Sequence, residues 1–226
     1  MSYLKTLNET QLQNMRYLLE ACTDGGITNH YTLAGILAVV SKESNFLPKS
    51  ETGYSKTPNN RIRAIFGSRV SGYSEEQLTN LKASDEKFFN VVYGGMYGNT
   101  DPGDGYKYRG RGANQITFKA NYEALRNSTG IDVVKNPDLV NDPIVGAKLS
   151  VTYFLNRFKK MPNTTKKIYA VDNINGFENL LTAVRCVYHA NAGWGKTIDM
   201  INADKTGGLK KTLSRCEELY YFIEGK

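Results

Sequence analysis

The sequence predicts a mainly α-helical fold. Over most of its 226 residues, apolar side chains recur every three or four positions, which is the period of a helix packed on one face. Residues that favour helix starts precede several of these stretches: capping-box patterns at 8–11 and 74–77, and an Asp-Pro pair at 142–143. No internal repeat and no clear linker divide the chain, so we expect a single domain over residues 1–226.

Two helices are expected before Pro48. The first carries an apolar stripe over residues 12–22 and ends at the glycine pair 25–26. The second begins near residues 29–32, and Glu43 continues its apolar stripe.

The segment from about residue 48 to 112 is expected to be an irregular insertion. Its helical signals are a short patch at 61–66 and the capping box at 74–77. Residues 94–116 are rich in glycine and lack periodicity, which predicts a long loop with at most a short strand or two. A loop of this length inside a compact chain is typical of a functional segment or of disorder.

Regular helices return in the second half. The apolar spacing predicts them over residues 118–130, 143–158, 177–188 and 209–223.

Composition limits the compartment and the partners. A net charge of +7 favours a polyanion, and nucleic acid, anionic membrane and bacterial wall polymers all qualify. Cys22, Cys186 and Cys216 cannot close a disulfide framework, and the first residues do not resemble a secretory leader, so we expect synthesis in a reducing cytosol. The apolar runs are far shorter than the roughly 20 residues of a membrane helix, and no Cys/His spacing resembles a zinc site. We therefore expect no stable membrane insertion, no metal and no cofactor.

Glu43 is the most informative single residue. A carboxyl group at the wet end of an apolar helix face is partly desolvated, which disfavours its anion. A carboxylic acid that stays protonated near neutral pH is what a general acid needs. The alternative interpretation is a surface glutamate in the last helical turn, paired with Lys42 or Lys49.

Glu51 lies just beyond Pro48 and is a candidate second acid. Glycoside hydrolysis with inversion needs a base that activates water, with the two carboxyl groups roughly 6.5–9.5 Å apart. Asp85, Asp101 and Asp104 are competitors for this role, and a solvated loop acid is the alternative interpretation of Glu51.

The stretch 106–117 combines aromatic side chains, arginines, glycines and short polar side chains. Aromatic rings give sugars an apolar platform, while amides and hydroxyls bond their substituents. Two alternatives stay open. The Arg-Gly-Arg-Gly run with tyrosines could bind RNA, and Thr117 could cap the helix that follows.

Four ordered elements together resemble the catalytic domain of glycoside hydrolase family 19, in its bacteriophage endolysin branch. The similarity covers roughly residues 33–158. The elements are Ser41-Lys42-Glu43-Ser44; residues 88–93 with Gly98-Asn99; Tyr108-Arg109-Gly110-Arg111-Gly112 with Gln115-Ile116-Thr117 and Asn121-Tyr122; and Asn136-Pro137 through Asp142-Pro143.

The resemblance implies a lysozyme-like α fold in two lobes with a substrate cleft. Glu43 would protonate the leaving glycosidic oxygen, Glu51 would activate the attacking water, and Thr117 would help to place that water. The remaining matched positions, expected to hold the sugar, are Tyr93, Arg109, Gln115 and Asn121.

Two departures from the family pattern bear on the site. The two glycines that usually follow the catalytic Glu-Ser in the family are reduced here, because Asn45 leads directly to Phe46, so the match to Glu51 needs a one-residue gap. Near the C-terminus, residues 185–191 replace the family's Arg-x-Ile-Asn-Gly-Gly, which leaves Asn191 as the candidate for its sugar contact.

The resemblance implies a peptidoglycan glycosidase that cuts β-1,4 bonds between amino sugars with inversion, for host lysis and phage release. We expect a monomer without a separate wall-binding domain. It is made in the host cytoplasm and reaches the wall after membrane permeabilisation, with a separate pore-forming holin giving access. The positive charge, the cysteine count and the lack of a leader favour wall over chitin. A chitinase of the same fold, and a non-catalytic wall- or nucleic-acid-binding module, are the alternatives.

Overall fold

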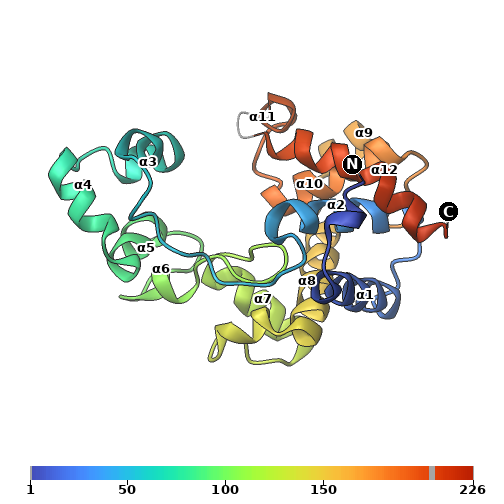
Figure 1. Ribbon diagram of the computed structural model, residues 1–226, viewed down its shortest axis with the longest axis horizontal. Helices are drawn as coiled ribbons and strands as arrows, with labels where there is room; N and C mark the ends of the chain where they lie inside the picture. Colours follow the sequence, from blue (N-terminus) through green and yellow to red (C-terminus); the bar gives the residue numbers. More distant parts are fainter. Residues whose placement is uncertain (1, 204–206, 226) are drawn as a thin grey trace. The chain divides into compact units, whose positions relative to one another are not determined.

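The computed structural model describes residues 2–203 and 207–225, and within them the fold is mainly α, which confirms the predicted class (Figure 1). An isolated bridge between Arg111 and Ile116 takes the place of strands in this described part. The chain forms two compact units. Unit 1 is Met1–Lys49, Gly112–Asn114 and Val140–Lys226, and unit 2 is Ser50–Arg111 and Gln115–Leu139.

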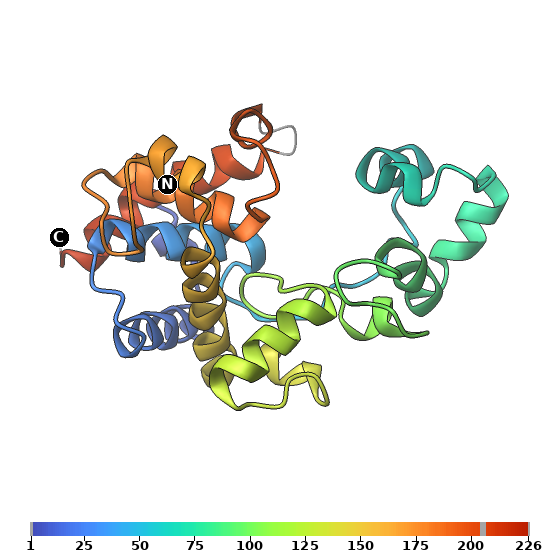
Figure 2. The same cartoon turned by 180° about the vertical axis from the view of Figure 1, so that it is seen from behind.

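Unit 1 is built around one buried helix. Its helices are α1 (Glu9–Asp24), α2 (His30–Ser44), α8 (Pro143–Lys159), α9 (Asn163–Tyr169), α10 (Leu180–Ala192), α11 (Ile198–Ala203) and α12 (Gly208–Ile223). Both α10 and α12 pack against α2, and α1 lies beside α8 (Figure 2). Residues 32–41 of α2 are all buried, because this helix is apolar on nearly every side. Gly35 allows close approach: a Cβ there would lie 3.2 Å from Cγ2 of Val187 on α10.

The capping signals position the helices as predicted. The Asn8 side chain accepts from the backbone N–H of Gln11, and the Gln11 side chain accepts from the backbone N–H of Asn8, which begins α1. Asp142 caps α8, with proline in its first turn. Gln11 also donates from Nε2 to the carbonyl oxygen of Asn45 (2.9 Å), so the start of α1 is bonded to the residue that ends α2.

The chain leaves α2 through two left-handed residues. Asn45 and Phe46 have φ angles of 52° and 60°. Asparagine tolerates this region, whereas phenylalanine does not favour it. Phe46 is 1% exposed within the core, and its burial offsets the strain. The left-handed conformation is thus adopted here by two residues that are not glycine.

Unit 2 is more ordered than the irregular insertion that we expected. It contains α3 (Asn59–Phe66), α4 (Glu75–Lys82), α5 (Asp85–Tyr93), α6 (Asp104–Lys107) and α7 (Lys119–Thr129). Short 3-10 helices occur in unit 1 at Leu4–Thr6, in unit 2 at Gly67–Arg69, and at Pro137–Asn141, where the chain passes from unit 2 to unit 1. Unit 2 has its own apolar cluster, which includes Leu78, Phe88, Phe89 and Val92. The predicted patch at 61–66 and capping box at 74–77 correspond to α3 and α4, whereas α5 and α6 are too short to show a clear period in the sequence, so tertiary packing decides them.

The helices expected in the second half are all present, and α9 and α11 were not predicted. The three cysteines are buried and free, and burial raises the pKa of Cys22 to about 12. None of the helices in residues 2–203 and 207–225 is long and apolar enough to cross a lipid bilayer.

Candidate active site

Glu43 lies in the last turn of α2, in unit 1, and is mostly buried: its side chain is 19% exposed. Its Oε1 accepts a hydrogen bond from Nδ2 of Asn191 at 3.1 Å. The Nζ of Lys42 lies 3.1 Å from the same oxygen. Because α10 packs on α2, two residues far apart in sequence, Glu43 and Asn191, meet at one place.

Asn191 is held by neighbours that fix the direction of its amide. Its Oδ1 accepts from Nδ2 of Asn114 (3.4 Å), and its carbonyl oxygen accepts from the hydroxyl of Tyr153 (3.2 Å). Asn114 in turn accepts from Oγ of Ser150 at 3.0 Å, and both of these residues are buried. With the amide oxygen engaged in this way, the NH2 group of Asn191 is directed to Glu43.

The pairing of Glu43 with Lys42, our alternative interpretation, is present in the structure. It does not make Glu43 an ordinary surface residue, because the same carboxylate oxygen is bonded to Asn191 and most of the side chain is buried. The role of Asn191 in sugar binding stays a prediction, and what the structure shows is a contact with the candidate acid.

Glu51 lies in unit 2 and is held by three donors. Its Oε1 accepts from the hydroxyl groups of Tyr54 (2.9 Å) and Tyr93 (3.1 Å), and its Oε2 accepts from the backbone N–H of Gly110 (3.3 Å). Burial raises the pKa of both tyrosines well above the ordinary phenol value, so their hydroxyls remain donors.

The electrostatics of Glu51 combine two opposed effects. Burial raises the pKa of its carboxyl group, while the hydrogen bonds from Tyr54, Tyr93 and Gly110 and the charge of Arg109 lower it. The net pKa is above the ordinary glutamate value. Glu51 is therefore not the solvated loop acid of the alternative interpretation. It is a partly desolvated carboxylate with a basicity greater than usual.

The backbone around Glu51 is clamped to the glycine-rich loop. The N–H of Glu51 donates to the carbonyl oxygen of Gly110 at 2.7 Å, and Nε of Arg109 donates to the carbonyl oxygen of Glu51 at 3.0 Å. The Arg109 guanidinium also lies 4.0 Å from the ring centroid of Tyr106. Arg109 thus holds Glu51 in place, and its predicted contact with sugar stays a prediction.

Three predicted site residues converge on Gly110. A Cβ at this glycine would lie 3.0 Å from Oε1 of Gln115, 3.2 Å from Oε2 of Glu51 and 3.4 Å from Oγ1 of Thr117. The absence of a side chain at Gly110 therefore leaves room for these polar atoms to lie together.

Thr117 does not cap the following helix, so that alternative is wrong. Helix α7 begins at Lys119 with Phe118 as its N-cap and no side-chain cap. The Thr117 hydroxyl instead donates to the carbonyl oxygen of Gln115 at 3.1 Å. Asn121, in the first turn of α7, donates from Nδ2 to the carbonyl oxygen of Thr117 at 2.6 Å. This arrangement fixes Thr117 and Asn121 beside the Glu51 cluster.

The competing acids are engaged elsewhere in unit 2. Nζ of Lys119 lies 2.7 Å from Oδ2 of Asp101 and 3.1 Å from Oδ2 of Asp104, and its hydrogen bond lowers the pKa of Asp101. Asp85 accepts from the backbone N–H of Gly53 at 3.0 Å. Carboxylates neutralised by a lysine are weak bases, which leaves Glu51 as the better candidate.

The predicted residues therefore form two groups. Unit 2 contains Glu51, Tyr93, Arg109, Gln115, Thr117 and Asn121, and unit 1 contains Glu43 and Asn191. The distance between the carboxyl groups of Glu43 and Glu51, roughly 6.5–9.5 Å in an inverting enzyme, stays a prediction. Sequence reasoning missed Tyr54 and Asn114. The short spacing of Tyr54 from Glu51, three residues along the chain, was the available signal for the first.

Residues 27–203 match the protein family described as Chitinase class I, which is glycoside hydrolase family 19. The chain belongs to glycoside hydrolase family 19. A family 19 domain-containing protein of Haemophilus influenzae is 34% identical over 114 residues, which are 47% of this chain and 56% of that protein. Chitinase 11 of rice is 37% identical over 57 residues, which are 25% of this chain and 22% of the rice protein. This family 19 chain thus spans about half of the bacterial relative and about a fifth of the plant one.

Among solved structures, chitinase C from Streptomyces griseus HUT6037 has a similar fold. The TM-score is 0.55 at 18% identity, over 98% of this chain and 73% of that chain. At this identity the similarity concerns the fold, and it agrees with the helical architecture of family 19.

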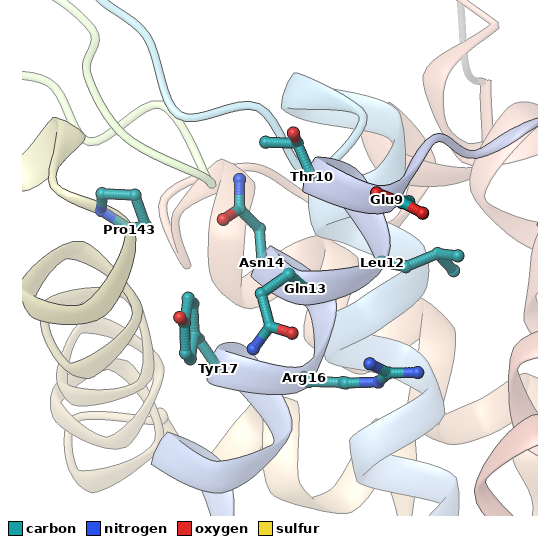
Figure 3. Close-up of a pocket in the computed structure, with 8 residues that line it drawn as sticks. All are labelled: Glu9, Thr10, Leu12, Gln13, Asn14, Arg16, Tyr17 and Pro143. Atoms are coloured by element: carbon teal, nitrogen blue, oxygen red, sulfur yellow. The ribbon is translucent and has the colours of Figure 1, made fainter.

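A hollow of about 680 Å³ lies elsewhere on this family 19 chain, along α1 (Figure 3). Gln13, Asn14 and Tyr17 of α1 line it together with Pro143, the first residue of α8. None of the predicted site residues lines it. Within the described residues, no group of three or more His, Cys, Asp or Glu side chains could hold a metal ion.

Proposed function

We propose that the chain is a peptidoglycan glycosidase, an endolysin that hydrolyses β-1,4 bonds between amino sugars of the bacterial wall by an inverting general acid/base mechanism. Its biological role is host lysis and phage release. The observation that carries this proposal is the pair of carboxylates in different surroundings: Glu43 bonded to Asn191, and Glu51 held by Tyr54, Tyr93 and Gly110.

In this mechanism the two carboxyl groups have separate tasks. Glu43 gives its proton to the leaving glycosidic oxygen. Glu51 accepts a proton from the attacking water, and the raised pKa of its carboxyl group makes it a stronger base, since catalysis is best when the pKa lies near the working pH. Thr117, with Oγ1 close to Gly110 and Glu51, helps to place the water.

A charged wall polymer fits this chain better than chitin does. The net charge is +7, and cationic side chains gather beside Glu43. Chitin carries no compensating negative charge, whereas the wall is rich in carboxylates and phosphates. The names of the rice and Streptomyces proteins make chitin hydrolysis the second candidate.

A nucleic-acid-binding module is disfavoured by the state of the loop arginines. Arg109 is bonded to Glu51, and Arg111 is buried with its Nε 2.8 Å from Oδ1 of Asp138. Side chains bonded in this way are poorly available to phosphates.

The substrate is identified by comparing the activity of the enzyme on purified bacterial wall with its activity on chitin. We expect the enzyme to clear a wall suspension and to release little from chitin oligomers. Chitin cleavage without wall clearance would replace the endolysin proposal with the chitinase. Adding the enzyme to intact cells with and without a pore-forming protein tests the expected need for a holin.

A further inference from the structure

The surface beside Glu43 is a basic pocket. It has a volume of about 330 Å³ and lies in unit 1, where the end of α2 meets α12. Its lining includes four cations, Lys42, Lys49, Lys211 and Arg215, and one carboxylate, that of Glu43. Ligand pockets have volumes of roughly 300–1,000 Å³, so this pocket has room for a small acidic group.

Arg215 is fixed in the wall of this basic pocket. Its guanidinium carbon lies 4.1 Å from the ring centroid of Tyr3, and its Nη1 donates to the carbonyl oxygen of Ser41 (2.8 Å) and to Oγ of Ser41 (3.3 Å). A guanidinium held by stacking and by hydrogen bonds loses little entropy when it binds a carboxylate. Lys211 stands one turn earlier on α12 and is exposed.

Lys42 joins the basic pocket to the candidate acid. Its Nζ lies 3.1 Å from Oε1 of Glu43 and 5.8 Å from the ring centroid of Tyr188. The start of α12 is close to this side chain, because a Cβ on Gly208 would lie 2.9 Å from Cε of Lys42. An anion in the pocket would therefore lie next to the group that we assign to proton donation.

We propose that the basic pocket binds a carboxylate of the peptide stem on wall glycan, and that it gives the enzyme its preference for peptide-bearing strands. The inference rests on the proposed function, since it takes Glu43 as the acid. Because the basic pocket includes Glu43, the carboxylate belongs to a sugar unit near the bond that is cut. Chitin has no carboxylate and would gain nothing from a pocket whose lining includes four cations and one carboxylate.

Matched substrates test this inference. Soluble glycan strands from sacculi that lack teichoic acid are used as they are, and after amidation of their stem carboxylates with methylamine. Wall phosphate is absent from both, so the comparison isolates the carboxylate. We expect KM of the unaltered enzyme to be about tenfold lower for the free-carboxylate strands, the effect of one hydrogen bond to a charged group.

Substitutions of Lys211 test whether the difference in KM arises in the basic pocket. Lys211→Met is expected to raise KM for free-carboxylate strands about tenfold, and Lys211→Glu to raise it further, with no change for amidated strands. The matched controls are Lys210→Met and Lys210→Glu on the same helix, which change net charge equally at a residue outside the pocket lining. Equal melting temperatures confirm that all variants fold.

The outcomes separate this inference from the proposed function. The carboxylate site is overturned if strands with free and with amidated carboxylates are cleaved equally fast. It is also overturned if the Lys211 substitutions change KM equally for both kinds of strand. In either case the glycosidase proposal stands. If neither strand is cleaved, NMR titration with a disaccharide–tripeptide muropeptide decides. Changes in the chemical shifts of residues 211–215 that disappear when the muropeptide is amidated then support the pocket, while the glycosidase proposal fails. If these chemical shifts do not change, both proposals are overturned.

Discussion

The carboxylate of Glu51 shows how the surroundings of one residue set its chemistry. Burial favours the protonated form, and two tyrosine hydroxyls and one backbone N–H favour the ionised form. The tyrosines therefore lower the pKa of this carboxylate as well as orient it. Removing one of them changes the balance in a known direction.

Tyr93→Phe is expected to move the acidic limb of the kcat/KM profile to higher pH, by roughly one unit. The substitution removes a hydrogen bond that lowers the pKa of Glu51, so this pKa rises further above its ordinary value. Since the base works only when ionised, activity is lost at a higher pH as the solution is acidified. Tyr73→Phe, elsewhere in unit 2, is the control, and an unmoved limb in Tyr93→Phe would show that Glu51 is not the titrating base.

Gly110→Ala is expected to lower kcat by about tenfold or more while the protein stays folded. The new methyl group would lie 3.0 Å from Oε1 of Gln115 and 3.2 Å from Oε2 of Glu51, so these side chains must shift. Gly72→Ala is the matched control, because nothing lies within 4 Å of the Cβ position there. Steady-state kinetics check the result, and equal rates for both variants would argue against a reacting centre at Gly110.

At the scale of elements, the helix ends were the most predictable part of the structure. The capping residues Asn8 and Asp142 act locally, so their effect could be read from neighbouring sequence. The patch at 61–66 and the capping box at 74–77 indicated α3 and α4, whereas α5 and α6 depend on packing around the apolar cluster of unit 2, which no local signal predicted.

In the candidate site, too, local contacts could be predicted from the sequence and contacts between distant segments could not. The Glu51 interaction with Tyr54 is local, and the loop motif around Gly110 predicted much of the Glu51 cluster. The hydrogen bonds that link Asn114 and Ser150 to Asn191 join distant segments, and a single sequence holds no sign of them. The left-handed turn at 45–46 was also hidden, because its residues are not glycines.

Gln11→Ala is expected to destabilise the protein by about 1–2 kcal/mol. The change removes one half of the capping box of α1 and the hydrogen bond to the carbonyl oxygen of Asn45, which ends α2. Gln13→Ala, two positions later on the same helix, should change stability little. Urea unfolding measures both, and similar midpoints for the two variants would show that the link between α1 and α2 contributes nothing.

At the scale of the whole molecule, each unit combines an apolar cluster of its own with part of the chemistry. Unit 1 has the buried α2 and Glu43, and unit 2 has an aromatic cluster and Glu51. The net charge of the chain is +7, which favours capture of an anionic polymer before any bond is cut. Each unit thus holds one of the two carboxylates on which the proposed glycosidase activity depends.

Mass spectrometry of digested wall is the most direct test of the account, because it detects new reducing ends and identifies the sugar that carries them. We predict such ends with the unaltered enzyme, and their loss with Glu43→Gln at unchanged wall binding. New reducing ends at an undiminished rate with Glu43→Gln, or wall clearance without any glycosidic cleavage, would contradict the account.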